Sequence, residues 1–270
     1  MGSFPRLRRM GVLGGLGPQA TMEFEARVHA VSRTLLPSRK SGGYPPMAVL
    51  YYRHPPFVLG ADERPLLPLR PHPRLLDAAR SLRPLADFLV MPANAPHVFH
   101  AELEEAFGGP FVSMVEAALA EVGRRGWTRV GVLGLGKPRV YLEPLERRGV
   151  EAIALPPEER ARLDAAIFGM MEGRADPESR RAARDAVDWL RAHGADGIIP
   201  GCTEIPLLLG DAPPDLIDPL QLLAEAAVRY SIPEDRRAEF GVAASSSALS
   251  GSFASSPPPE SSALPASLTA

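Results

Sequence analysis

Short apolar runs alternate with longer amphipathic segments along most of the chain. The runs are rich in aliphatic residues and have the length of buried strands, whereas Ala, Leu, Arg and Glu fill the gaps in a helical pattern. This alternation predicts an α/β fold with doubly wound parallel sheets. The predicted strands are MGVLG (10–14), MAVLYY (47–52), DFLVM (87–91), FVSM (111–114), RVGVLG (129–134), AIAL (152–155), DGIIP (196–200) and DLIDP (215–219).

The chain also contains an internal echo. The string GVLG occurs at 11–14 and again at 131–134, and ADFLV at 86–90 is echoed by ADGII at 195–199. The first pair lies 120 residues apart and the second 109. Similar offsets in one direction predict two similar halves, with about eleven extra residues in the Pro/Arg-rich stretch 53–74 of the first half.

The echo gives a domain prediction. We expect an N-terminal α/β half over 10–112, with 219–236 packing back onto it, and a C-terminal half over 113–218, the two pseudo-symmetric halves facing a central cleft. From residue 241 to 270 Ser, Ala and Pro dominate, and Glu260 is the only charged residue. Such a composition is typical of a disordered tail.

Composition and charge exclude several classes of function. The chain has 270 residues, is 45% hydrophobic and carries a net charge of −2 without a basic block, so neither nucleic-acid nor membrane binding is expected. No apolar run has the length of a bilayer span, and the first apolar run, broken by glycines, is not expected to be a signal peptide. One cysteine allows neither an internal disulfide nor a thiolate metal cluster, which fits a cytoplasmic protein.

The single cysteine, Cys202, is the first candidate for chemistry. It follows the predicted strand 196–200 and precedes TEIPLLL (203–209), which resembles a short helix, and working groups of α/β sheets lie beyond the carboxyl ends of strands. Nearby free amides would lower the pKa of its thiol. The alternative is a cysteine packed as a small hydrophobic residue. The echo offset of 109 places Ala93 at the equivalent position of the other half.

Four segments together resemble the aspartate/glutamate racemase superfamily over about residues 10–232. They are GVLGGLGPQAT (11–21), VMPANAPH (90–97), PGCTEIPLLL (200–209) and LIDP (216–219). The resemblance implies a cofactor-independent amino-acid racemase, in which one thiolate removes the α-proton and a second thiol on the opposite face delivers a proton. The motifs of that family resemble CNTAH and GCTE.

This chain keeps the second motif and departs from the first. Cys202 remains as the base or acid, but Ala93 stands where the family has its first cysteine. A methyl group can neither take nor give a proton, so one base of the two is missing. Gly134 to Lys137 replace threonines that hold the substrate carboxylate in many relatives, so the resemblance does not carry specificity for acidic substrates.

Further site residues are expected around this pair, and the expected ligand is a small carboxylate or amino acid. Backbone amides before Pro18 could hold a carboxylate at a helix start. His97 matches the motif histidine and is a possible auxiliary proton carrier; with His100 and Glu102 it only superficially resembles a metal site, surface histidines are the alternative interpretation, and no metal is expected. The predicted substrate-binding residues are Gly15, Leu16, Gly17, Asn94, Ala95, Lys137, Thr203 and Glu204.

Several alternatives stay open at this stage. The segment 15–20 fits G-x-G-x-x-A, but the next strand lacks the acidic end that a dinucleotide site needs. Within the family, the chain could be an impaired or one-sided racemase, a single-cysteine enzyme resembling arylmalonate decarboxylase, or a non-catalytic carboxylate-binding homologue. Ala93 could also be an engineered substitution in an ordinary racemase. Because relatives are commonly dimers, we expect a homodimer.

Overall fold

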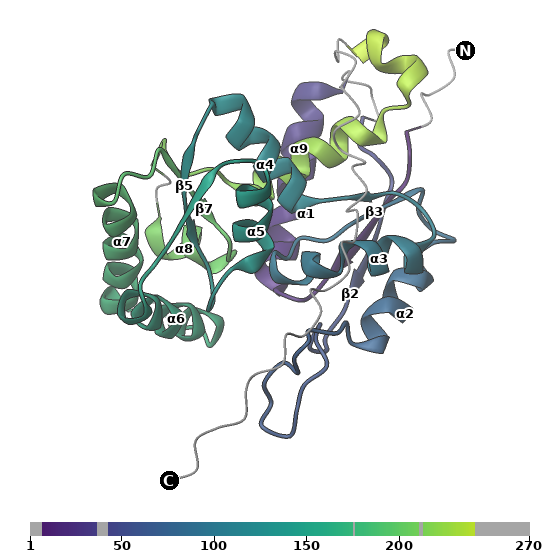
Figure 1. Cartoon of the computed structure of the whole chain (residues 1–270). Coiled ribbons are helices and arrows are strands. Elements are labelled where there is room, and N and C mark those ends of the chain that lie inside the picture. Colours follow the sequence, from purple (N-terminus) through teal and green to yellow (C-terminus); the bar gives the residue numbers. More distant parts are fainter. Residues whose placement is uncertain (1–6, 37–42, 175, 211–212, 241–270) are drawn as a thin grey trace.

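The computed structural model describes residues 7–36, 43–174, 176–210 and 213–240, and it confirms the predicted α/β fold with two parallel sheets (Figure 1). The strands are β1 Met10–Gly14, β2 Met47–Tyr51, β3 Phe88–Val90, β4 Phe111–Val112, β5 Arg129–Leu133, β6 Glu151–Ala154 and β7 Gly197–Pro200. The first sheet has the order β2-β1-β3-β4 and the second the order β6-β5-β7. All neighbours in both sheets are parallel. The predicted tail 241–270 lies outside the described residues.

Proline in the first turn begins five of the described α-helices, namely α1, α2, α6, α7 and α9, as expected for a residue whose missing N–H costs nothing there. The α-helices are α1 Pro18–Leu35, α2 Pro73–Leu82, α3 His100–Phe107, α4 Met114–Arg125, α5 Arg139–Arg147, α6 Pro157–Met171, α7 Pro177–Ala192, α8 Glu204–Leu209 and α9 Pro219–Ser231. Two 3₁₀ helices complete the described part, η1 Ala95–Phe99 and η2 Glu234–Phe240. None of the helices in the described ranges is both long and apolar enough to cross a membrane.

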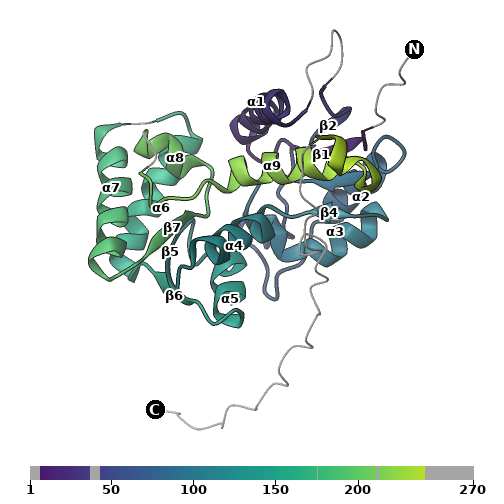
Figure 2. The same ribbon diagram turned by 90° about the horizontal axis from the view of Figure 1, so that it is seen from above.

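Helices cover both faces of each sheet. In the first half, α1, α4 and α9 pack on one face around Phe24 and Leu223, and α2 and α3 pack on the other around Leu75 and Leu103. In the second half, α6, α7 and α8 cover one face and α4 and α5 the other. Helix α9 leaves the second half and runs back across the first sheet, where it contacts α1 and α4 (Figure 2). Residues of α4 belong to the apolar cores of both halves, so this helix packs between the two sheets.

The prediction of a strand at DLIDP (215–219) is wrong. A single parallel bridge joins Ile198 to Leu216, and the segment then turns into α9. Asp218 causes the change, because its carboxylate accepts hydrogen bonds from the backbone amides of Leu220 and Gln221 and so caps the helix. The segment therefore borders the second sheet without joining it as a strand.

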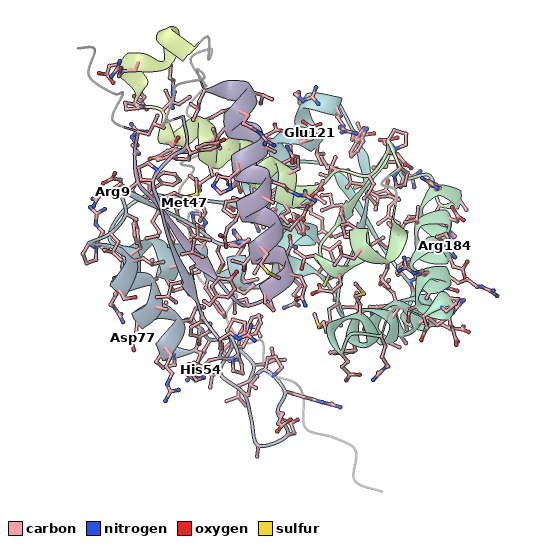
Figure 3. All side chains as sticks on the ribbon, turned by 180° about the vertical axis from the view of Figure 1, so that it is seen from behind. Arg9, Met47, His54, Asp77, Glu121 and Arg184 are labelled. Carbon is pink, nitrogen blue, oxygen red and sulfur yellow. The ribbon has the colours of Figure 1, made fainter. Side chains whose placement is uncertain are left out.

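A long loop between β2 and α2 has no counterpart in the second half. We call residues 55–71 the flap; it projects as the blue loop below β2 in Figure 1, and in Figure 3 His54 marks the place where it begins. Antiparallel bridges join Phe57 to Pro71 and Leu59 to Pro65. Between β6 and α6 only residues 155–156 intervene. The extra residues predicted in 53–74 thus form an ordered hairpin-like projection.

Candidate active site

The carboxyl ends of β3 and β7 occupy equivalent places in the two halves. Each strand pairs in parallel with the strand that opens its own half, and Val90 and Ile199 hold equivalent positions in those pairs. Ala93 stands three residues beyond Val90, and Cys202 stands three residues beyond Ile199. The sheets therefore place the two residues as the echo predicted.

Both residues line one cavity of about 500 Å³ between the halves. A Cβ atom built on Gly17 would lie 3.9 Å from the side-chain oxygens of Thr203 and Glu204, so the first half closely faces the second here. The predicted site residues that the first half brings to the cavity are Leu16, Gly17, Ala93, Asn94 and Ala95. Those from the second half are Lys137, Cys202, Thr203 and Glu204.

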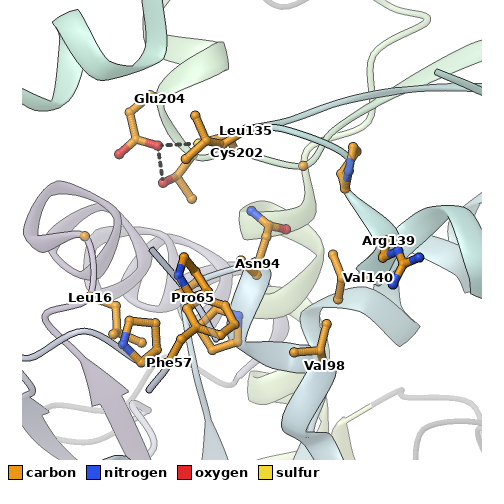
Figure 4. Close-up of a pocket in the computed structure, with 18 of the residues that line it drawn as sticks. Leu16, Phe57, Pro65, Asn94, Val98, Leu135, Arg139, Val140, Cys202 and Glu204 are labelled. Carbon is orange, nitrogen blue, oxygen red and sulfur yellow. Dashed lines mark hydrogen bonds between the residues drawn. The ribbon is translucent and has the colours of Figure 1, made fainter. Parts of the chain in front are cut away.

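Cys202 is half-buried, and its thiol is hydrogen bonded. The sulfur donates to Oε2 of Glu204 at 2.8 Å, a contact drawn as a dashed line in Figure 4. Burial, together with the negative charge of Glu204, raises the pKa of the Cys202 thiol well above its ordinary value. The sequence-based expectation of a lowered pKa is therefore wrong, since desolvation and a carboxylate outweigh the backbone amides. The resting form of this residue at neutral pH is the thiol.

Glu204 is the hydrogen-bond acceptor for two neighbouring side chains. Its Oε2 atom accepts from the sulfur of Cys202 and, at 3.1 Å, from the hydroxyl of Thr203. Glu204 itself opens α8, and all three residues line the cavity. A carboxylate in this position can take the proton of the thiol and return it, which is the property that a proton-transfer site needs.

His97 holds the backbone around Ala93 and does not line the cavity. Its Nδ1 atom is 2.7 Å from the carbonyl oxygen of Ala93, and Nε2 accepts a hydrogen bond from the amide of Met114. Burial lowers the pKa of His97 to about 3, so the ring stays neutral at ordinary pH. His97 and His100 are both buried, which corrects the interpretation as surface histidines. With both ring nitrogens engaged, His97 positions the strand end and has no free nitrogen for a substrate proton.

Asn94 lies at the centre of the site and is fixed by a residue that the sequence analysis missed. The hydroxyl of Tyr141, on α5, donates to Oδ1 of Asn94 at 2.5 Å, and both side chains are buried. Figure 4 shows the amide nitrogen of Asn94 below Cys202, and Asn94 is among the residues that line the cavity. The only sequence signal for Tyr141 is an aromatic residue on the apolar face of a short helix.

The glycine-rich turn before α1 contributes less than predicted. The amide of Gly15 donates to the hydroxyl of Thr21 at 2.8 Å and is therefore not available to a ligand, and Gly15 does not line the cavity. Gly15 has a φ of 81°, and a Cβ atom there would meet the backbone of Tyr51 and Tyr52 within 2.8 Å. The glycine is thus required by the turn itself, whereas Leu16 and Gly17 reach the cavity.

Lys137 and Ala95 lie at the exposed side of the cavity. Lys137 belongs to the loop after β5, beside the loop that carries Cys202, as shown by the 3.5 Å approach of a Cβ atom built on Gly134 to the carbonyl oxygen of Gly201. No ion pair joins Lys137 to any other side chain in the described ranges. An unpaired ammonium at the mouth of the cavity is able to attract a carboxylate.

A second cavity, of about 410 Å³, meets the first at the thiol. Asn94, Cys202 and Thr203 line both. The second cavity is otherwise bounded by α1, α8 and the start of α9, including Arg27, which forms an ion pair with Asp218. Cys202 is therefore reached from two directions.

Comparisons with known proteins agree on one family. The family model described as Asp/Glu/Hydantoin racemase matches residues 13–227. The broad specificity amino-acid racemase RacX of Bacillus subtilis (strain 168) is 25% identical over 225 residues, which are 81% of this chain and 96% of RacX.

Two solved structures share the fold. One is a putative Asp/Glu racemase from Yersinia pestis, with a TM-score of 0.67 and 22% identity over 84% of this chain and 100% of that one. The other is an aspartate racemase homologue from Pyrococcus horikoshii OT3, with a TM-score of 0.65 and 24% identity over 83% of this chain and 99% of that one. At these identities the likeness establishes the fold.

Proposed function

Because the chain belongs to the Asp/Glu/Hydantoin racemase family, we propose that this isomerase-family enzyme exchanges the α-proton of an amino acid through Cys202, on one face only. The observation that carries the proposal is the hydrogen bond from the thiol of Cys202 to Glu204 in a cavity whose other strand end presents Ala93. One wall of the cavity thus has a proton carrier, and the equivalent place on the other wall has a methyl group.

The proposed reaction begins with the neutral thiol. The proton of Cys202 passes to Oε2 of Glu204, and the thiolate then takes the α-proton of the substrate while the C–H electron pair stays on the substrate as an enolate. The hydrogen on sulfur exchanges with water, and return of a solvent-derived proton from sulfur to the same face restores the starting enantiomer. Glu204 then gives its proton back to the thiolate, which regenerates the neutral thiol. Because Ala93 cannot deliver a proton to the opposite face, the substrate exchanges hydrogen with solvent and inverts inefficiently.

Binding groups surround the proposed proton carrier. The ammonium group of Lys137 and the amide of Gly17 are assigned to the substrate carboxylate, and the amide nitrogen of Asn94 to the enolate oxygen that develops during the reaction. Oε1 of Glu204, which does not receive the thiol proton, is assigned to the substrate ammonium. The thiol and the carboxylate carry the proton between them, so the mechanism calls for no cofactor.

Incubation of both enantiomers of an amino acid in heavy water tests the proposal. We expect deuterium to enter the α-position of one enantiomer while the optical rotation changes slowly, and Cys202→Ala to abolish the exchange. Rapid inversion by the unmodified chain would contradict a one-sided mechanism. Ligand binding without any exchange would favour a non-catalytic carboxylate-binding protein.

A decarboxylase-like reaction is the second candidate, and the raised pKa of Cys202 favours it. A resting thiol is ready to protonate the carbanion left when carbon dioxide departs from a disubstituted malonate, and such a step needs one face only. Against it, Glu204 would repel one of the two substrate carboxylates. Release of carbon dioxide from a phenyl-substituted malonate, without α-proton exchange in amino acids, would select this reaction.

The homodimer and the cytoplasmic location stay predictions from the sequence. Light scattering on the purified chain, with a mass of twice the 29.0 kDa monomer, is the expected result for a dimer.

A further inference from the structure

The cavity has two chemically different ends. Cys202 and Glu204 lie at one end in Figure 4, and Leu16, Phe57 and Pro65 gather at the other. Leu69 lines the cavity as well. The apolar end therefore consists mainly of flap residues, together with Leu16 from the turn before α1.

The flap presents these side chains on an ordered scaffold. The amide of Val58 donates to the carbonyl of Arg70 at 3.0 Å, and the amide of Leu66 donates to the carbonyl of Val58, also at 3.0 Å. Phe57 packs edge-on against Phe99 of η1 with ring centroids 5.5 Å apart. The apolar wall is thus fixed by backbone hydrogen bonds and by contact with the core of the first half.

Among the described residues, none with a positively charged side chain lines the flap end of the cavity. Among the described residues that line it, the cationic side chains are Lys137 and Arg139, both on the segment after β5, and Arg139 forms an ion pair with Glu143 at 3.6 Å. Arg64 and Arg70 belong to the flap but do not line the cavity. A second carboxylate on the substrate, placed at the flap, would lose its hydration without gaining a partner.

From this polarity we infer that the substrate carries a large apolar side chain, aromatic or branched aliphatic, which packs against Phe57, Pro65 and Leu69. The inference rests on the proposed function for the orientation of the substrate, with its α-carbon at Cys202 and its carboxylate at the Lys137 side. The volume of about 500 Å³ lies within the roughly 300–1,000 Å³ of small-molecule pockets and leaves room for such a group.

Calorimetric titration with single amino acids tests the inference without requiring turnover. The probes are both enantiomers of phenylalanine, leucine, alanine, aspartate and glutamate. We expect phenylalanine and leucine to bind roughly tenfold or more tightly than alanine, in line with the gain from methylene and ring contacts, and aspartate and glutamate to bind more weakly than alanine. Tighter binding of the acidic pair, or no binding of any apolar probe, would overturn the inference.

Substitutions in the flap show whether its side chains cause the tighter binding of phenylalanine. Phe57→Ala should weaken phenylalanine binding by roughly tenfold and leave alanine binding unchanged, because alanine does not reach the flap. Leu69→Ala is a second variant with the same expected direction, and it is independent of the packing between Phe57 and Phe99. The matched control is Leu67→Ala, since Leu67 is 81% exposed at the same flap and does not line the cavity. Equal loss for alanine and phenylalanine in both flap variants would contradict a side-chain pocket.

The binding test of the apolar pocket and the deuterium-exchange test of the proposed function can give different answers. Tight phenylalanine binding without deuterium exchange would reject the proton-transfer proposal and keep the apolar pocket. Exchange confined to aspartate or glutamate would keep the proton-transfer proposal and reject the apolar pocket.

Discussion

The sulfur of Cys202 donates a hydrogen bond to the carboxylate of Glu204, two residues further along the chain, at 2.8 Å. The two side chains belong to one strand-to-helix connection, and both line the cavity between the halves. The proton of the thiol is therefore shared with a group that can accept it, and the chemistry of the site depends on this pair.

Glu204→Gln should lower the pKa of the Cys202 thiol relative to the unmodified chain. Loss of the negative charge removes one cause of the raised pKa, while burial, the larger cause, remains. Because the chain has a single cysteine, the pH dependence of its alkylation by iodoacetamide, followed by the mass of the cysteine-containing peptide, reports the thiolate of this residue alone. The same variant should slow α-proton exchange by about 10²–10⁴-fold, the usual contribution of a general base.

Glu158→Gln is the control for this substitution, since Glu158 is exposed on α6 and lines neither cavity. An unchanged or higher thiol pKa in Glu204→Gln would show that the carboxylate does not act on the sulfur in solution.

Ala93→Cys should create or raise racemisation. The new thiol would lie at the strand end equivalent to that of Cys202 and line the same cavity, so it supplies a proton carrier on the second wall. Inversion is measured by chiral chromatography. Ala95→Cys is a demanding control, because Ala95 lines the same cavity but lies within η1. Racemisation by both variants would argue against a mechanism with one proton carrier on each wall of the cavity. Racemisation by neither variant, although both bind the amino acid, would argue against it as well.

Tyr141→Phe should destabilise the fold by about 1–3 kcal/mol, because it leaves the buried Oδ1 atom of Asn94 without its donor. Urea unfolding gives the free energy. Tyr51→Phe is the comparison, since its hydroxyl makes only a 3.4 Å exposed contact with Glu25, and a change within about 0.5 kcal/mol is expected. Equal effects of the two substitutions would mean that the Tyr141 hydrogen bond is not maintained in solution.

His97 should make the fold sensitive to acid. Its pKa is about 3 in the folded state against 6.5 in its ordinary state, so below about pH 6.5 the unfolded chain binds a proton that the folded chain rejects. This contribution to stability is complete above pH 6.5 and declines steadily as the pH falls toward 3. Unfolding free energies of the unmodified chain and of His97→Gln, measured from pH 7 to 4, should converge on acidification. Free energies of unfolding that differ by a constant amount over this pH range would contradict the low pKa of His97 in the folded state.

The sequence predicted those features that depend on local patterns. Val12 and Ile198 lie in apolar runs short enough to identify as strands, and the echo predicts that Ala93 and Cys202 are equivalent positions. The hydrophobic pattern predicts the wrong element where a side-chain contact decides between a strand and a helix. Residues 215–219 have the apolar content of a strand, but the carboxylate of Asp218 caps α9 instead.

In the candidate site, too, local sequence patterns predict some features, whereas others depend on side-chain contacts. The thiol was placed at a strand end correctly, but its pKa direction depends on how Glu204 folds back onto the sulfur, which no spacing reveals. Tyr141 is 47 residues from Asn94, and Phe57 lies in a loop whose length alone was predicted. Long-range packing of this kind is absent from any short window of sequence.

The wall shared by the two cavities has one more consequence. Asn94, Cys202 and Thr203 form a partition whose faces look into separate spaces. A sulfur atom in such a partition is able to renew its hydrogen from water behind it while a substrate occupies the compartment in front. Solvent isotope would then reach the sulfur through the second cavity while the substrate stays bound in the first.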